Sequence, residues 1–156
     1  MDFEYLVDCQ NAIPTIAEWY VKQWGHLVEG DTFDDALRRM RDYLNRDKIP
    51  FILLGLDQND IRGVAQLKYR EMGDIYPDRE HWLGGVYVPQ EHRRRGVGSE
   101  IVEKIVSLAP QHGVETLNLQ TEKLDGGLYT RLGWKPVERT KNRGLDVLVM
   151  ERRLGP

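Results

Sequence analysis

The sequence predicts a mixed α/β domain built around one central sheet. Three observations predict this class: short apolar runs typical of strands, longer amphipathic runs typical of helices, and glycine or proline residues between them. In chain order the expected elements are a strand, two helices, three strands, a helix, a strand, a helix and two strands. The chain has 156 residues and no Pro/Gly/Ser-rich linker, so we expect one domain over residues 1–156.

The first third of the chain predicts one strand and two helices. Residues 3–7 form an apolar strand-like run, and residues 12–23 have helical spacing. A second helix is expected to begin at Thr32, because Asp35 completes a Thr-x-x-Asp capping pattern. It is expected to end before Pro50.

The remaining strands and helices follow from the same patterns. The strand-like runs are residues 51–56, 61–69, 82–88, 116–119, 134–137 and 145–150. A polar turn at residues 57–60 joins the first two runs into a hairpin. Helices are expected at residues 96–108 and 126–131, the second of them ended by Gly133 in a left-handed cap.

Composition excludes several classes of protein. Hydrophobic residues are 40% and charged residues 30%, as in a folded, water-soluble domain. There is no apolar run of about 18 residues, so no membrane span is expected. The net charge of −3 argues against a general nucleic-acid binder. One cysteine, Cys9, leaves no internal disulfide, and together with the absence of a signal-peptide pattern this predicts a cytoplasmic protein.

The sequence also argues against a metal centre and a cysteine nucleophile. Cys9 follows the first predicted strand, with no histidine or acid pattern beside it that would activate a thiolate. The four histidines lack the spacing of metal ligands, and no metal is expected. They are His26, His81, His92 and His112.

The most distinctive segment is an arginine- and glycine-rich turn at residues 92–99, between the predicted strand 82–88 and the predicted helix 96–108. The first amides of a helix point at one place and favour an anion, commonly a phosphate. Gly96 and Gly98 allow the backbone to approach such a group closely. Three arginines at a helix start are unfavourable unless an anion compensates them. The candidate contacts are Arg93, Arg94, Arg95, Gly96, Val97, Gly98 and Ser99.

Two segments resemble the GCN5-related N-acetyltransferases, the GNAT superfamily. Residues 88–99 are similar to the motif Gln/Arg-x-x-Gly-x-Gly/Ala that follows a Val-Pro strand end in that family. Residues 128–134, Leu-Tyr-Thr-Arg-Leu-Gly-Trp, resemble the family segment Phe-Tyr-x-x-Leu-Gly-Phe. Residues 120–125 lack an asparagine that many relatives use to contact coenzyme A. The resemblance covers nearly the whole chain and implies a mostly antiparallel sheet, flanked by helices and splayed at the cofactor-binding strand.

The resemblance further implies acetyl-CoA as the cofactor. Its pyrophosphate would lie on the amides of residues 94–99, and its pantetheine arm would run along the backbone of Val86, Tyr87 and Val88. Gly84 and Gly85 would leave room for the acetyl group or form a β-bulge, two roles that are compatible.

For the chemistry, the resemblance implies that Tyr129 gives a proton to the leaving thiolate; the alternative is a tyrosine packed in the core. Glu80, next to His81, is the candidate general base. The alternatives are that both are solvated loop residues or that a water chain removes the proton. The expected reaction is direct attack by a primary amine of a small molecule or peptide.

Acceptor recognition is expected from residues 19–35 and from a loop at residues 138–145. Aromatic side chains could line a slot, and carboxylates could attract a cationic amine. The alternative is that the aromatics belong to the core and that the acids stabilise a helix start. The residues considered are Trp19, Tyr20, Trp24, Glu29, Asp31, Asp34 and Asp35.

Two other functions remain open. The chain could be a non-catalytic acyl-CoA-binding module that senses the cofactor or recruits a partner. The arginine-rich turn could instead contact nucleic acid, although neither a nucleic acid nor a membrane is an expected partner. A homodimer is left open as the assembly state.

Overall fold

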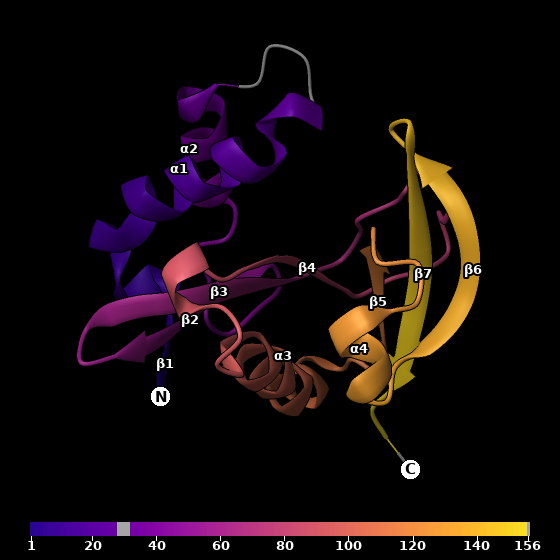
Figure 1. The fold of residues 1–156 in the computed structure, drawn as a ribbon. Coiled ribbons are helices and arrows are strands. Elements are labelled where there is room, and N and C mark those ends of the chain that lie inside the picture. The colour runs from indigo at the N-terminus through magenta and orange to yellow at the C-terminus, as the bar shows by residue number, and fades with distance from the viewer. Residues whose placement is uncertain (28–31, 156) are drawn as a thin grey trace.

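A seven-stranded sheet forms the centre of the fold, with helices on both of its faces (Figure 1). The computed structural model describes residues 1–27 and 32–155. The strands are β1 (Asp2–Tyr5), β2 (Phe51–Asp57), β3 (Asp60–Lys68), β4 (Trp82–Tyr87), β5 (Thr116–Thr121), β6 (Lys135–Asn142) and β7 (Leu145–Arg153). The α-helices are α1 (Ile13–Trp24), α2 (Phe33–Arg41), α3 (Val97–Leu108) and α4 (Gly127–Arg131).

The order of strands in the sheet is β1-β2-β3-β4-β5-β7-β6. All neighbouring strands are antiparallel except β4 and β5, which are parallel. The mixed, mostly antiparallel sheet flanked by helices is therefore confirmed, and so is the predicted chain order of the principal strands and helices.

The two faces of the sheet carry separate hydrophobic clusters. On one face α1 and α2 pack on alternate residues of β2 and β3, in a cluster that contains Leu6, Ala12, Ile16, Ala17, Ala36, Met40, Ile52, Leu54 and Val64. On the other face α3 packs on the intervening residues, in a cluster that includes Phe51, Leu53, Ala65, Leu67, Ile101, Ile105 and Leu117. The sheet is thus a middle layer between helices (Figure 1), with apolar contacts on both of its faces.

Several local predictions hold at the level of single residues. The Thr32 hydroxyl accepts a hydrogen bond from the Asp35 amide, and the Asp35 carboxylate accepts one from the Thr32 amide, which completes the predicted capping box of α2. At the β2–β3 turn, Gln58 and Asn59 have φ of 51° and 68°, the conformation of a tight two-residue hairpin. Gly133 has φ of 90°, as expected for the cap after α4.

Two local predictions are wrong. The expected first strand at residues 3–7 ends at Tyr5, and a 3-10 helix, Leu6–Asp8, buries Leu6 beneath α1 and α2. The expected acceptor loop at residues 138–145 is not a loop. Most of it belongs to β6, which continues to Asn142 and pairs with β7 through a short turn at residues 143–144. Side chains along β6 are mostly polar and exposed, so the sequence lacks the alternation that marks a half-buried strand.

Candidate active site

The sheet opens between its parallel neighbours β4 and β5. Their register contains one pair, Trp82 with Asn118, and no further pair joins them within the described residues. The buried Asn118 fixes this point, because its Nδ2 donates to the carbonyl oxygens of Glu80 at 3.0 Å and His81 at 3.2 Å. Beyond it, the edge of β4 that faces β5 is unpaired as far as Tyr87. This confirms the predicted splay.

A bulge in β4 lies inside the splayed part. Gln66 of β3 pairs with Gly84, and Val64 of β3 pairs with Tyr87. The two pairs are thus two residues apart along β3 but three residues apart along β4. The extra residue is accommodated by Gly85, which has φ of 54°. The β-bulge predicted for the glycine pair is therefore present, and it changes the direction of the backbone just before the predicted contacts Val86, Tyr87 and Val88.

The arginine–glycine turn leads from β4 into α3 as predicted. Gly96 has φ of 79° and occupies the N-cap position, so no side chain caps the helix. An added Cβ would meet nothing within 4 Å at Gly96, and at Gly98 its nearest neighbours would be Leu128 at 3.5 Å and Val88 at 3.9 Å. The first amides of α3, from Val97 through Ser99, therefore remain available to an anion.

The three arginines of the turn divide into two roles. Arg93 folds back on β4: its Nε donates to the carbonyl oxygen of Val88 at 2.8 Å, and its guanidinium carbon lies 5.7 Å from the centre of the Tyr87 ring. Arg94 and Arg95 are exposed. Neither forms an ion pair with any acid in the described parts of the chain.

The second motif lies against the first. Leu128 of α4 is the nearest neighbour of the space beside Gly98, so residues about thirty positions apart meet at the start of α3. Tyr129 is half-buried with its ring edge toward buried Trp134, at 6.0 Å between centroids, and burial raises the pKa of its hydroxyl to about 12. Within the described chain this hydroxyl has no hydrogen-bond partner. It therefore keeps its proton at neutral pH and can donate it outside the chain.

The structure places Glu80 and His81 at the entrance of β4, outside the splayed part. The Glu80 side chain is 52% exposed, and its carboxylate lies 3.4 Å from the guanidinium of Arg70. The His81 ring packs against Tyr69 at 5.5 Å.

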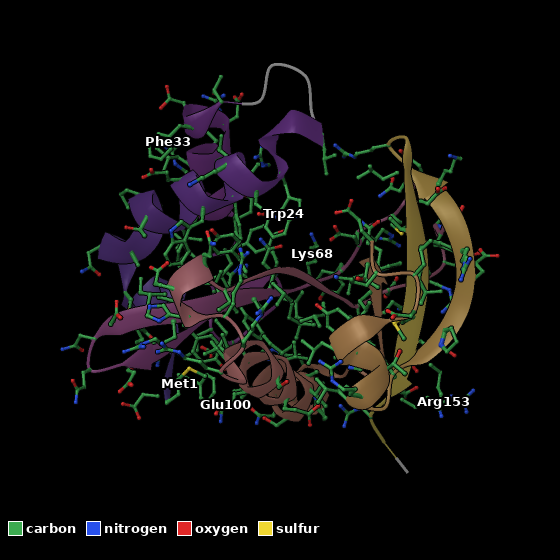
Figure 2. The ribbon with its side chains drawn as sticks, in the orientation of Figure 1. Met1, Trp24, Phe33, Lys68, Glu100 and Arg153 are labelled. Carbon is green, nitrogen blue, oxygen red and sulfur yellow. The ribbon has the colours of Figure 1, made fainter. Side chains whose placement is uncertain are left out.

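A polar group at the glycine pair was not predicted from the sequence. We call Tyr20, Gln66, Lys68 and Glu71 the glycine-pair cluster, because their polar atoms cover Gly84 and Gly85 on the face that carries α1 and α2. The Tyr20 hydroxyl donates to the Gly85 carbonyl oxygen at 2.9 Å. Lys68 is labelled in Figure 2, which shows it in the middle of the view between α1 and β7. Nothing in the sequence pattern of residues 69–81 marks Glu71 as different from its neighbours.

The predicted acceptor aromatics cluster on β4. Trp19 stacks on Tyr87 at 5.3 Å between centroids, and Trp24 meets the same ring in a T-shaped arrangement at 6.3 Å. These ring contacts, and the hydrogen bond from Tyr20 to Gly85, hold α1 against β4.

The carboxylates predicted to attract the acceptor amine lie in different surroundings. Asp35 caps α2 and pairs with Arg38, as the structural alternative expected. Asp34 is exposed in the first turn of α2. Glu29 and Asp31 lie outside the described residues, as does the side chain of His26.

The structure supports neither a cysteine nucleophile nor a metal cluster in the described residues. Burial, and then the charges of Glu4 and Asp8, raise the pKa of the Cys9 thiol, so the thiol is protonated and a poor nucleophile at neutral pH. In residues 1–27 and 32–155, no three or more His, Cys, Asp and Glu side chains gather as they would around a metal ion. No helix in those ranges is long and apolar enough to cross a membrane.

Comparisons with solved structures identify the fold. A ribosomal-protein-alanine N-acetyltransferase from Brucella melitensis matches with a TM-score of 0.77 and 18% identity, over 99% of this chain and 100% of that chain. Aminoglycoside 6'-acetyltransferase type Ii matches with a TM-score of 0.74 and 18% identity, over 100% and 99%. The protein yncA from Salmonella typhimurium, solved with its cofactor acetyl-CoA, matches with a TM-score of 0.75 and 16% identity, over 99% and 94%.

Comparisons of sequence identify the family. No curated protein matches the chain. The sequence profile of the acetyltransferase (GNAT) family matches residues 13–134, which include both motifs, the glycine pair and the splayed strands. The chain therefore belongs to the acetyltransferase (GNAT) family.

Proposed function

We propose that this protein is an acetyl-CoA-dependent N-acetyltransferase that acetylates a primary amine of a small molecule or peptide by direct attack in a ternary complex. One observation carries the proposal: the open start of α3, the helix α4 that carries Tyr129 and the unpaired edge of β4 lie next to one another. Leu128 against Gly98 joins the first two, and the arginine–glycine turn joins the first to the third.

The residues of this site fit acetyl-CoA. The amides from Gly96 to Ser99 suit the pyrophosphate, and two glycines leave its approach free of Cβ atoms. Arg94 and Arg95 supply positive charge that no acid in the described chain neutralises, while Arg93 holds the turn against β4. The backbone of Val86, Tyr87 and Val88 would pair with the amides of the pantetheine arm as an added strand does. The acetyl-CoA named for yncA supports the same assignment.

The reaction requires the acceptor nitrogen to lose a proton and the departing sulfur to gain one. Acetyl-CoA supplies an activated thioester. In our proposal the acceptor nitrogen forms its bond to the acetyl carbon while the bond from that carbon to sulfur breaks, and Tyr129 gives its proton to the sulfur. Cys9 plays no part, because its thiol is protonated and lies in the segment between β1 and α1. Glu80 is predicted as the base from the sequence alone, and its exposed carboxylate pairs with Arg70.

The proposal is tested by binding and turnover together. We expect acetyl-CoA to raise the unfolding temperature and to release free thiol when cationic small molecules and peptides with a free amine are supplied, with mass spectrometry identifying the acetylated product. Tight acetyl-CoA binding without turnover on any amine would favour the sensor module. Absence of stabilisation, combined with nucleic-acid binding that weakens steeply with salt, would favour the nucleic-acid alternative.

A further inference from the structure

The glycine pair of β4 carries an ion pair directly above it. A Cβ added to Gly84 would lie 2.9 Å from Oε2 of Glu71 and 3.1 Å from Nζ of Lys68. These two side chains also contact each other as an ion pair and are only 17% and 21% exposed for Lys68 and Glu71. An ammonium and a carboxylate therefore lie together beside the bulge, in the splayed part of the sheet.

The Glu71 carboxylate is held by residues from distant strands. Its Oε1 accepts a hydrogen bond from Nε2 of Gln120 in β5 at 3.2 Å. Oε1 of Gln120 in turn accepts one from Nδ2 of Asn142 at the end of β6, at 2.9 Å. This chain of contacts fixes one carboxylate oxygen and leaves the other, Oε2, facing Lys68 and Gly84.

The charge of Glu71 reaches the surrounding helices. Burial is the main cause that raises the pKa of Tyr20, and the negative charge of Glu71 adds to it. Burial also raises the pKa of Tyr43, where Lys68 acts in the opposite direction and Glu71 in the same direction. The ionisable groups around Glu71 are thus Lys68 from β3, Tyr20 from α1 and Tyr43 after α2.

Stability alone does not explain this arrangement. Removing an ion pair from water costs about as much as its attraction returns, so a mostly buried pair is weak evidence for a stabilising role. Glu80 forms its ion pair with Arg70 at the surface instead. Lys68 and Glu71 already place a primary ammonium against a fixed carboxylate, which is the contact an acceptor amine needs.

We propose that Glu71 is the carboxylate that binds the acceptor. The ammonium group of the acceptor takes the place of the Lys68 ammonium beside this carboxylate. This inference rests on the proposed N-acetyltransferase function and names the substrate class, a cationic primary amine. One oxygen of Glu71 takes the proton from the acceptor nitrogen. The freed lone pair forms the nitrogen–carbon bond, the carbon–sulfur bond breaks, and the sulfur takes the Tyr129 proton. Gln120 and Asn142 are positioning residues that hold Glu71.

The principal test replaces Glu71 with Gln, which keeps the shape of the side chain. We expect kcat/KM for the acceptor to fall about 100-fold, with unchanged acetyl-CoA affinity measured by calorimetry. The matched control is Glu103→Gln, which removes the partner of Arg152 on the exposed side of α3 and should leave kcat/KM unchanged. In Glu71→Gln, kcat/KM should rise by about one log unit per pH unit while the acceptor deprotonates in solution, whereas the wild type should reach its plateau earlier.

A second variant tests the exchange and does not depend on the folding of the first. Lys68→Met removes the internal competitor, so the KM for the acceptor should fall about tenfold while acetyl-CoA affinity stays the same. An unchanged or increased KM would overturn the exchange. If the wild type is active and Glu71→Gln keeps the full kcat/KM, the role of Glu71 is overturned and the proposed function stays intact. A wild type that acetylates no amine would overturn both.

Discussion

Tyr129 is the side chain whose proposed role can be separated most clearly from binding. Its hydroxyl is protonated at neutral pH and lacks a partner in the described chain, so at neutral pH its removal should affect proton donation and leave coenzyme binding unchanged. We expect Tyr129→Phe to lower kcat about 100-fold with unchanged acetyl-CoA affinity, as measured by steady-state kinetics and calorimetry. Tyr69→Phe removes a hydroxyl from a 48% exposed tyrosine and should change neither value. Normal turnover in Tyr129→Phe would exclude Tyr129 as the acid.

The same residue predicts a change of stability at high pH. Burial raises the pKa of Tyr129 from 10.0 to about 12 in the folded protein. The folded state therefore holds this proton more tightly than the unfolded state, and the resulting stability is complete below pH 10 and is lost as pH rises through about 12. The difference in unfolding free energy between the wild type and Tyr129→Phe should be constant below pH 10 and decline above it.

Urea unfolding across that pH range measures this difference. Burial and the hydrogen bond to Glu138 raise the pKa of Tyr76 to about 12 as well, but this effect is shared by both proteins and cancels in the comparison. A difference that stays constant throughout would show that the Tyr129 hydroxyl is hydrated in the folded protein.

At the scale of elements, the start of α3 should separate folding from coenzyme binding. Gly98→Glu places an acid in the first turn, which the helix dipole tolerates, but in the space proposed for the pyrophosphate. We expect acetyl-CoA to lose at least about 100-fold in affinity and to stop raising the unfolding temperature. Gly98→Ala is the control for folding, because its Cβ would lie in ordinary contact with Leu128 at 3.5 Å. Unchanged acetyl-CoA affinity in Gly98→Glu would reject the proposed pyrophosphate site.

Elements whose signals are local could be predicted from the sequence. The capping box from Thr32 to Asp35 depends on residues within a few positions of each other, and the bulge in β4 is marked in the sequence by two adjacent glycines, Gly84 and Gly85. Glu71 could not be predicted, because its position over β4 is set by strand neighbours from β3 to β6 that are far apart in the sequence. For the same reason the second part of β6, residues 138–142, is predicted as a loop and not as a strand: its polar residues become a strand only through pairing with β7.

At the scale of the whole molecule, the sheet connects the groups of the proposed site. The strand β4 lies between α3 on one face of the sheet and α1 and α2 on the other (Figure 1). The ion pair of Lys68 and Glu71 lies against Gly84 of this strand, and the start of α3 follows the strand in the chain. The hydrogen bonds of Asn118 hold the point from which β4 and β5 diverge. An acyl donor on one side and an acceptor amine on the other could therefore meet through the opening.

This shared sheet predicts that the chain unfolds as one unit. Ile52 and Leu54 of β2 pack beneath α1 and α2, while Phe51 and Leu53 pack against the cluster of α3, so neither layer can separate without exposing the same strand. We expect urea unfolding followed by tryptophan fluorescence and by far-ultraviolet circular dichroism to give the same midpoint.

The four tryptophans allow the unfolding of α1 and of the sheet to be followed separately. Trp19 and Trp24 report on α1, whereas buried Trp82 and Trp134 report on β4 and on the segment before β6. A variant with Phe at positions 19 and 24 leaves fluorescence from the second pair alone, and we expect its fluorescence midpoint to coincide with its own circular dichroism midpoint. An earlier loss of helical signal in that variant would mean that α1 and α2 unfold separately. The acceptor side could then open without loss of the coenzyme site, and acetyl-CoA would stabilise only the later transition.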